Sequence, residues 1–397
     1  MAVCRNINAN IGKGGINFQS ATSLFANHHD LPKGPEPHYD QISSHIKPSQ
    51  PTYTRPRRRV DTYTGWWTNR ANSPWKAKAE MPASQAESAA RSASSVEHAS
   101  SATSSFIQVE DWDDSASLTD SVQTFPEEFG RTYHAYRAGS YLFPNDNTEQ
   151  ERLGIMGECY KMIMKGKLYL APLSTRRPPK NILDVATGIG DWAIQMGDIF
   201  PNATIIGTDL SPIQPNDVPP NVYFYVEDST SGCWSDFETQ IAQQAFNALE
   251  PGGWFESQET DCIPLCDDDT LDPQGPVATW CNDLIAAADK LERPAIFGKN
   301  LKEIYKRVGF VDVHERIIKM PINGWAKDPR LKQVGWMWAD HMLDGLSGFS
   351  YQLLNKAFER TSAQIEVSLI DVRRDLMNPR IHAYMPLYVV WGRKPKK

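Results

Sequence analysis

The sequence predicts an α/β fold in which an open, mostly parallel sheet carries helices on both faces. Three observations predict it. A short apolar run at residues 182–185 leads into a turn of small residues, a helix-like segment follows at 192–199, and two further strand-like runs end in acidic residues, Asp209 and Asp228. The carboxyl ends of parallel strands line the ligand crevice of an open sheet. The polar residues at these ends are therefore expected to converge on one small molecule.

The first 108 residues are predicted to form a disordered, low-complexity tail. Residues 31–56 are rich in Pro, His and Lys, and residues 84–105 are rich in Ser and Ala. Such sequence buries too little apolar area to offset the conformational entropy lost on folding. The ordered domain is therefore expected to span residues 109–397.

Charge separates the tail from the domain. Residues 1–110 hold 12 Lys and Arg against 8 Asp and Glu, within a chain of net charge −7, so a basic tail precedes an acidic domain and nucleic acid is not an evident partner of the fold. Arg55-Pro56-Arg57-Arg58-Arg59 is compatible with a nuclear-import signal or a nucleic-acid contact, although a solvated basic run is the plainer interpretation.

No targeting or metal-binding pattern stands out. The sequence has no secretion signal and no apolar run of membrane-spanning length, which favours a cytoplasmic or nuclear location. The cysteines lack disulfide-framework or metal-ligand spacing, so reduced thiols and no metal are expected. They are Cys4, Cys159, Cys233, Cys262, Cys266 and Cys281.

The elements of the domain follow from apolar periodicity. A helix is expected over 149–170, and prolines at 172, 178 and 179 end it before the first strand. Asp191 opens the next helix, where a carboxylate favours the helix dipole. The remaining expectations are strands at 203–208, 222–226, 254–258, 311–320 and 381–391, helices at 276–291 and 301–308, and a largely helical lid over about 326–378.

The residues around the first strand indicate a nucleoside-bearing ligand. Gly188 and Gly190 allow a ligand to approach the backbone and to meet free amide groups. Asp209 lies 19 positions after Gly190, where a carboxylate accepts from both hydroxyls of a ribose, at about 1.5–3 kcal/mol per charge-assisted bond. Asp228 is then placed to accept from an exocyclic amine.

A nicotinamide oxidoreductase is the weakest of the alternatives. Residues 188–193 satisfy the loose dinucleotide pattern G-x-G-x-x-A. Asp184, however, precedes the loop, where a carboxylate repels a pyrophosphate but suits a cationic amino-acid group. Pro251-Gly252-Gly253, a turn between a helix and a strand, is the second feature against a dinucleotide.

These motifs resemble class I S-adenosylmethionine-dependent methyltransferases, which have a Rossmann-like sheet. The resemblance rests on D-x-A-T-G-x-G at 184–190, the acidic end of the second strand and L-x-P-G-G-W at 249–254. Residues 130–137, Pro144-Asn145-Asp146, Glu149-Gln150 and residues 207–215 are similar, more narrowly, to the fungal LaeA-like methyltransferases. That group includes cluster enzymes and regulators of secondary metabolism that associate with velvet proteins. The likeness covers roughly residues 113–395.

The resemblance implies a methyltransferase that uses S-adenosyl-L-methionine and acts on a secondary metabolite or a regulatory protein, with velvet-type proteins as possible partners. Methyl transfer from a sulfonium mainly requires proximity, so no catalytic residue is assigned, and His134, His341 and His382 are the histidines to test. Tyr133, on an arm over the site, is either a cofactor contact or a packed aromatic. The implied cofactor-binding residues are Tyr133, Asp184, Ala186, Gly188, Gly190, Asp209, Leu210 and Asp228, with Ala186 in place of the usual first glycine.

One segment departs from the family. Residues 233–237 lead almost directly into the next helix, so comparison with the family's usual spacing predicts that the fourth-strand segment is absent. In the class I order, 3-2-1-4-5-7-6, that strand lies between strands one and five, and each backbone group left buried and unpaired costs about 1–3 kcal/mol. Either the sheet closes up, another segment substitutes, or the copy is mis-spliced or decayed. The absent segment favours the alternative of a catalytically inactive, cofactor-binding regulatory protein that acts through partners. The intact cofactor motif favours the enzyme, with Asp184, Gly188, Gly190, Asp209 and Asp228 all present.

Overall fold

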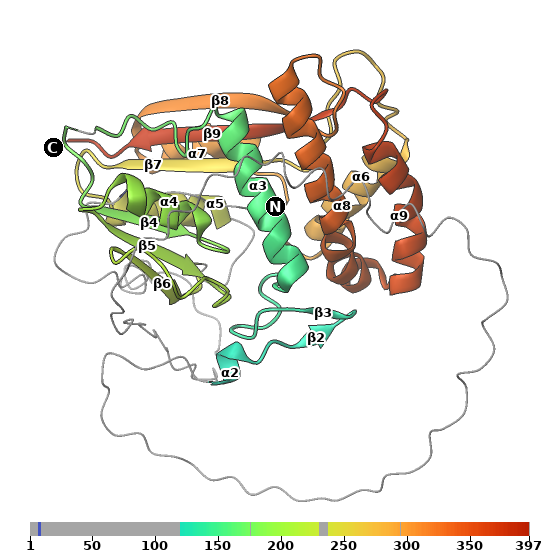
Figure 1. The fold of residues 1–397 in the computed structure, drawn as a ribbon, viewed down its shortest axis with the longest axis horizontal. Helices are drawn as coiled ribbons and strands as arrows, with labels where there is room; N and C mark the ends of the chain where they lie inside the picture. The colour runs from blue at the N-terminus through green and yellow to red at the C-terminus, as the bar shows by residue number, and fades with distance from the viewer. Residues whose placement is uncertain (1–6, 9–119, 175, 230–236, 294, 397) are drawn as a thin grey trace, which may run out of the picture. The chain divides into compact units, whose positions relative to one another are not determined.

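A seven-stranded sheet organises the domain (Figure 1). The computed structural model describes residues 7–8, 120–174, 176–229, 237–293 and 295–396. The strand order is β6-β5-β4-β1-β7-β9-β8, which is the class I methyltransferase order with β1 in the place of the fourth strand. The predicted α/β fold is confirmed. The basic run Arg55–Arg59 and nearly all of the predicted tail lie outside the described residues.

Three parallel strands form the half of the sheet that the sequence resolves most clearly. Residues opposite one another in register include Asp184 and Gly207, and Asp209 and Val226. All three strands therefore end at one edge of the sheet, as expected from their acidic ends. The strands are β4 (Asn181–Val185), β5 (Thr204–Asp209) and β6 (Val222–Val226).

A short segment from the beginning of the chain occupies the position that the fourth strand has in the class I order. Strand β1 (Ile7–Asn8) pairs antiparallel with β4 on one side and β7 on the other, so that Ile7 lies opposite both Leu183 and Phe255. The expectation of a tail without structure does not hold at these two residues. The physical reason is that the facing edges of β4 and β7 carry backbone groups that need partners.

The other half of the sheet is antiparallel. Strand β9 lies between β7 and β8 and pairs with both. It begins three residues later than the sequence indicated, because residues 381–383 precede the ladder. The strands are β7 (Trp254–Thr260), β8 (Val311–Pro321) and β9 (Tyr384–Arg393).

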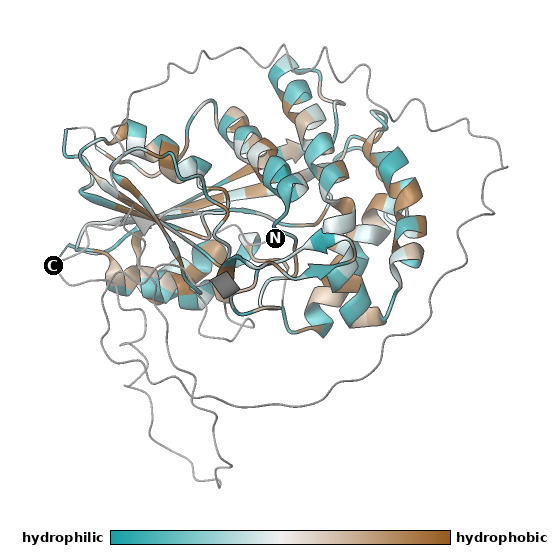
Figure 2. Cartoon of the chain, turned by 60° about the horizontal axis from the view of Figure 1, so that its bottom comes forward, coloured by the Kyte–Doolittle hydropathy of each residue, from teal (hydrophilic) through white to brown (hydrophobic). Residues whose placement is uncertain are grey.

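Helices cover both faces of the sheet. Helix α4 (Asp191–Ile199) packs with Ile182 on one face, whereas α5 (Phe237–Ala248) and α7 (Leu301–Val308) pack with Leu183 on the other. Neighbouring residues of β4 thus point to opposite faces, as the period of a strand requires. Figure 2 shows helices with hydrophobic residues on one side and hydrophilic residues on the other.

The largest core cluster joins four further helices to the antiparallel strands. Gly335 allows a close approach there, because a Cβ at this position would lie 1.9 Å from the carbonyl oxygen of Asn323. The helices are α3 (Asn147–Ile163), α6 (Pro276–Lys290), α8 (Pro329–Phe358) and α9 (Ser362–Leu376). Shorter elements are α2 (Asp120–Gln123), β2 (Glu127–Glu128), β3 (Arg131–Thr132) and η3 (Gly298–Asn300).

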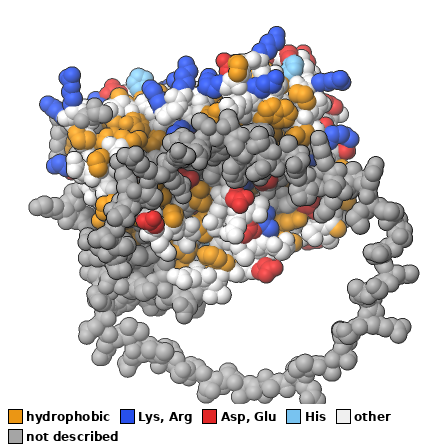
Figure 3. Space-filling model, in the orientation of Figure 1, with side chains coloured by type: hydrophobic (Ala, Val, Ile, Leu, Met, Phe, Trp, Pro, Cys, Tyr) orange, Lys and Arg blue, Asp and Glu red, His pale blue; other side chains and the backbone are white. Residues whose placement is uncertain are grey.

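The surface carries no membrane-spanning element within the described part of the chain. None of its helices combines the length and the apolar composition that crossing a bilayer requires. On the face drawn in Figure 3, Lys and Arg side chains gather along the upper margin, over β8.

Candidate cofactor-binding site

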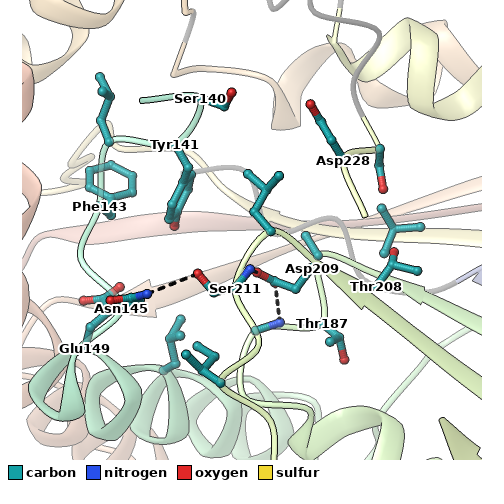
Figure 4. A pocket seen from close by; sticks show the side chains of 18 of the residues that line it. Ser140, Tyr141, Phe143, Asn145, Glu149, Thr187, Thr208, Asp209, Ser211 and Asp228 are labelled. Carbon is teal, nitrogen blue, oxygen red and sulfur yellow. Dashed lines mark hydrogen bonds between the residues drawn. The ribbon is translucent and has the colours of Figure 1, made fainter. Parts of the chain in front are cut away.

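A cavity of about 200 Å³ opens at the carboxyl ends of β4, β5 and β6. Its wall is mostly apolar and combines three parts of the chain (Figure 4). The first is the set of turns that follow the parallel strands. The second is the arm at 140–145 with the first turns of α3, and the third comprises α6, α8 and the loop at 293–297. The ends of the parallel strands therefore converge on one pocket, as the sequence predicted.

The turn after β4 forms the floor of the cavity. Ala186 and Gly188 line it with left-handed backbone angles, φ +55° and +58°, and the amide of Thr187 donates to Thr208 O at 2.9 Å. Gly190 lies just outside the lining and begins α4 with φ +80°, where a Cβ would come within 2.4 Å of the Phe224 ring. The turn therefore requires a glycine at 190.

Asp209 is held at the bottom of the cavity by backbone amides. The amide of Gly188 donates to Asp209 Oδ2 at 2.8 Å, and the amide of Ser211 donates to Oδ1 at 3.0 Å. Burial raises the pKa of Asp209 to about 6, although these amide bonds oppose the shift. Leu210 lines the same wall. A carboxylate in such surroundings suits a ligand that donates hydrogen bonds.

Asp228 lines the cavity beyond Asp209 and is paired with the arm. Arg137 Nη1 donates to Asp228 Oδ2 at 2.8 Å, and the Asp228 side chain is only 3% exposed. Its neighbour Glu227 also lines the cavity, and burial together with the charge of Asp228 raises the pKa of Glu227 to about 7. Sequence reasoning identified Asp228 but not its arginine partner.

Asp184 does not line the cavity. Its side chain is fully buried, and Asp184 Oδ2 accepts from the hydroxyl of Thr187 at 2.7 Å. Because strand side chains alternate, Asp184 shares with Ile182 the face that α4 covers. In this position it supports the turn from beneath, whereas the sequence had placed it against the cationic group of a ligand.

The arm brings Tyr141 to the cavity and leaves Tyr133 outside the lining. Tyr133 is 3% exposed, burial raises its pKa, and its hydroxyl has no hydrogen-bond partner among the described residues. Tyr141 and Phe143 line the cavity instead, with their rings edge to face and their centroids 5.1 Å apart. The arm that the resemblance singled out thus lines the cavity through Tyr141 and Phe143 and not through Tyr133.

None of the three histidines singled out in the sequence lines the cavity. His134 and His341 are buried, and burial lowers the pKa of both, most strongly for His341 beside Arg152. His382 is exposed, with Nδ1 2.5 Å from Asp268 Oδ2. The described lining thus holds no imidazole that could act as a base.

The far wall is formed by residues that sequence reasoning missed. Arg293 closes it by donating from Nη1 to Ser140 O at 3.0 Å. Asp261, buried after β7, accepts from the amides of Phe297 and Gly298 and so fixes the loop that carries the wall. Its apolar members are Phe237, Ala288, Ala295, Phe297 and Leu353. They come from separate elements, so no local pattern identifies them.

Comparisons with known proteins place the chain in a family. No protein-family model matches it. It is 36% identical over 297 residues to "Methyltransferase pytC" of Aspergillus terreus, which covers 70% of this chain and 91% of that protein. It is 32% identical to "Secondary metabolism regulator LAE1" of Cochliobolus heterostrophus, over 68% of this chain and 95% of that protein. It is 31% identical to "Protein-methionine methyltransferase laeA" of Emericella nidulans, over 68% and 77%.

A solved structure of Haemonchus contortus phosphoethanolamine N-methyltransferase 2 with S-adenosyl-L-methionine is similar at 16% identity. The TM-score is 0.34, and the match covers 67% of this chain and 62% of that one. The sequence relatives, at 31–36% identity over more than two thirds of the chain, show the family. The chain belongs to the LaeA-like family of S-adenosylmethionine-dependent methyltransferases.

Proposed function

We propose that the cavity binds S-adenosylmethionine through the ends of β4, β5 and β6 and presents its methyl group to an acceptor at the apolar far wall. The observation that carries this proposal is the carboxylate of Asp209, fixed by the amides of Gly188 and Ser211 on the cavity floor. Its raised pKa reflects the cost of burying a charge. Two ribose hydroxyls donating to Asp209 would offset that cost.

The remaining lining fits the same ligand. Asp228, with one oxygen held by Arg137, faces the adenine amine in this arrangement. Ala186, Gly188 and Leu210 supply backbone and apolar contact, while Gly190 shapes the turn. Asp184 acts through Thr187. Tyr133 stays a prediction as a cofactor contact, because its side chain is buried outside the lining.

The cofactor, when bound, supplies an electrophilic methyl group on a positively charged sulfur. The role of the protein is then to hold acceptor and methyl group in line and to exclude water, which is worth about 7–11 kcal/mol in well-oriented systems. The apolar far wall, including Phe237, Phe297 and Leu353, provides the dry surface. Arg293 fastens this wall to the arm at Ser140.

The lining favours an acceptor whose nucleophile needs no proton removal. No histidine, lysine or cysteine occurs among the described residues that line the cavity. The carboxyl groups with raised pKa, Asp209 and Glu227, follow β5 and β6, at the adenosine end, and burial raises the pKa of the Tyr141 hydroxyl. We therefore propose a thioether or a neutral amine on a secondary metabolite or a regulatory protein. A thioether also agrees with the name of the Emericella nidulans relative, a protein-methionine methyltransferase.

Three further proposals rest on the sequence: the regulatory partners, the location in the cell and the bounds of the catalytic domain. We infer velvet-type regulatory partners from the family resemblance. We infer a cytoplasmic or nuclear location, with the basic run Arg55–Arg59 as a candidate nuclear-import signal. Residues 109–397 are proposed as the catalytic domain, with α8 and α9 in its helical lid.

The cofactor proposal is tested by calorimetric titration of the full-length chain. S-adenosylhomocysteine and S-adenosylmethionine should bind one to one and NAD should not. Asp209→Asn should weaken binding by about tenfold or more, since it removes charge-assisted bonds of about 1.5–3 kcal/mol. Asp217→Asn is the matched control, because Asp217 is exposed in the loop between β5 and β6 and outside the lining. A folded protein that binds neither ligand, or that prefers NAD, would overturn the proposal.

The acceptor proposal has its own test. Full-length protein with methyl-labelled cofactor is offered two peptides that differ only in methionine against norleucine, and two small acceptors that differ in amine against hydroxyl. Label transferred to the methionine peptide or to the amine supports the proposal. Transfer to the hydroxyl acceptor alone contradicts it, because that chemistry calls for a base.

A further inference from the structure

Glu149, in the first turn of α3, is a carboxylate on the cavity wall that the proposed adenosine contacts do not use. Its side chain is 2% exposed and lines the cavity. Helix α3 begins at the end of the arm, where Asp146 caps it by accepting from the amide of Glu149 at 3.1 Å. The cap fixes the helix start, and Glu149 is thereby placed on the cavity side of the first turn.

A buried arginine holds this carboxylate in place. Arg152 Nε donates to Glu149 Oε2 at 2.8 Å, Arg152 Nη2 donates to Oε1, and both side chains are 2% exposed. The guanidinium carbon lies 4.8 Å from the centre of the Phe349 ring, and Arg152 Nη1 is 3.1 Å from His341 Nδ1. Gly345 leaves room for the arginine, because a Cβ there would lie 2.8 Å from Arg152 Cδ.

A buried ion pair of this kind adds little net stability. Removing two charges from water costs about as much as their attraction returns, and apolar replacements are often neutral or stabilising. The burial lowers the pKa of His341 well below its usual range, so the histidine contributes no compensating charge. Because net stability does not explain the Glu149–Arg152 pair, its position at the edge of the cavity indicates a role in ligand binding.

Three of the four carboxylates that line the cavity, Glu149, Asp209 and Asp228, follow the order of the parts of the cofactor. In the view of Figure 4, Asp209 lies between Glu149 and Asp228. The Tyr141 hydroxyl lies close enough to both Glu149 and Asp209 for their charges to raise its pKa. The cofactor is a chain of adenine, ribose and amino acid, with hydrogen-bond donors on each part. If Asp209 and the end of β6, with Asp228 and its neighbour Glu227, face the first two, Glu149 is the carboxylate left for the third.

Helix α3 also adjoins the turn that carries the cofactor loop. A Cβ on Gly188 would lie 3.6 Å from Leu153 Cδ1, one helical turn after Glu149. Asn145 Nδ2, just before the helix, is 3.4 Å from the hydroxyl of Ser211, whose amide holds Asp209. Glu149 and Asp209 thus belong to one continuous wall, whereas Asp184 is buried beneath the turn.

We propose that Glu149 binds the α-ammonium group of the methionine end of S-adenosylmethionine and that Arg152 is the residue that positions Glu149. The inference rests on the cofactor site proposed above. Both Glu149 oxygens accept from Arg152 and keep further lone pairs for the ammonium. A zwitterionic amino-acid end then meets a neutral ion pair, so no net charge is buried.

The test compares ligands that differ at the amino-acid end. Calorimetry of the full-length chain uses S-adenosylhomocysteine, its analogue with hydrogen in place of the ammonium group, and 5′-methylthioadenosine, which lacks the amino acid. Glu149→Gln should weaken S-adenosylhomocysteine by about tenfold or more and leave 5′-methylthioadenosine within about twofold. The analogue without the ammonium group should bind wild type and variant alike.

Two further variants separate recognition from folding. Glu149→Gln combined with Arg152→Met removes both charges and avoids an unpaired buried arginine, and it should show the same selective loss. Arg131→Met is the matched control, since Arg131 pairs with Asp146 at the start of the same helix and does not line the cavity. The inference would be overturned if both Glu149 variants weakened the binding of all ligands equally, or if they weakened the binding of none. If the wild-type protein binds none of these adenosine ligands, the proposed cofactor site is wrong, and this result is distinct from a failure of the Glu149 inference alone.

Discussion

Arg137 and Asp228 are 91 positions apart in the sequence, yet their side chains form an ion pair with 2.8 Å between Arg137 Nη1 and Asp228 Oδ2. One partner belongs to the arm and the other to the end of β6. The Arg137 backbone adopts a left-handed conformation, φ +49°, which turns the chain toward the cavity. The pair therefore ties the arm to the strand end that faces the proposed adenine position.

Replacing Arg137 tests this tie. We expect Arg137→Gln to speed dissociation of S-adenosylhomocysteine by up to several-fold in stopped-flow measurements, a modest effect because a pair with a half-exposed partner contributes about 0–1 kcal/mol. The difference should shrink as salt is added. Arg374→Gln, which breaks an exposed pair with Asp371 on α9, should leave the rate unchanged. An equal effect of the two variants would contradict a role for the arm.

Cofactor affinity should depend on pH through Asp209. Its pKa of about 6 lies above the ordinary aspartate value, so the carboxyl gains a proton as the pH falls through 6 and then accepts from the ribose less well. Affinity measured by calorimetry should be constant above about pH 7 and should decrease below 6, and this decrease should be lost in Asp209→Asn. Glu227, with a pKa of about 7, is the other titrating group of the cavity, and Glu227→Gln separates its contribution.

The stability of the ligand-free protein should decrease as the pH rises, whereas cofactor affinity increases. A carboxyl whose folded pKa is raised binds more protons in the folded state, so the protein loses stability as the pH rises from the unfolded value of about 4 to the folded value. The thermal shift given by S-adenosylhomocysteine should therefore grow from pH 5 to 7.5. Glu256, buried away from the cavity with a pKa raised to about 7, provides the control. Glu256→Gln should change the stability profile without changing the ligand profile.

Ala186→Gly should stabilise the protein. Ala186 has φ +55°, a left-handed conformation that costs an alanine about 1–2 kcal/mol and a glycine almost nothing. Because glycine also adds entropy to the unfolded chain, the expected gain is about 0.5–1 kcal/mol in denaturant unfolding. Ala242→Gly, in the middle of α5, should instead destabilise by about 1 kcal/mol. Loss of stability in Ala186→Gly would contradict the assigned backbone angle.

Ile7→Pro tests the strand that replaces the missing one. Proline removes the amide at Ile7, between Leu183 and Phe255, and each ladder group left unpaired costs about 1–3 kcal/mol. We expect faster hydrogen exchange at β4 and β7, measured by mass spectrometry. Ile7→Ala keeps the amide and should show little change. Unaltered exchange in Ile7→Pro would mean that β1 does not hold these two strands.

The sequence by itself determined the parallel half of the sheet and the position of the site. Apolar runs with period two and a turn of small residues define β4, and acidic residues mark the strand ends at Asp209 and Asp228. These are local signals, because a strand and its following turn lie within a few residues of one another. The family motifs then identified the cofactor as S-adenosylmethionine.

Only the tertiary structure decided which side chains line the cavity. Asp184 lies beneath the turn because of its place in the strand alternation, and the course of the arm selects Tyr141 over Tyr133. Glu149 joins the cavity because α3 packs against the turn after β4. The filling of the strand gap by Ile7 depends on two backbone edges more than 170 positions away in the chain. Such long-range contacts follow from packing and backbone pairing, which no short stretch of sequence encodes.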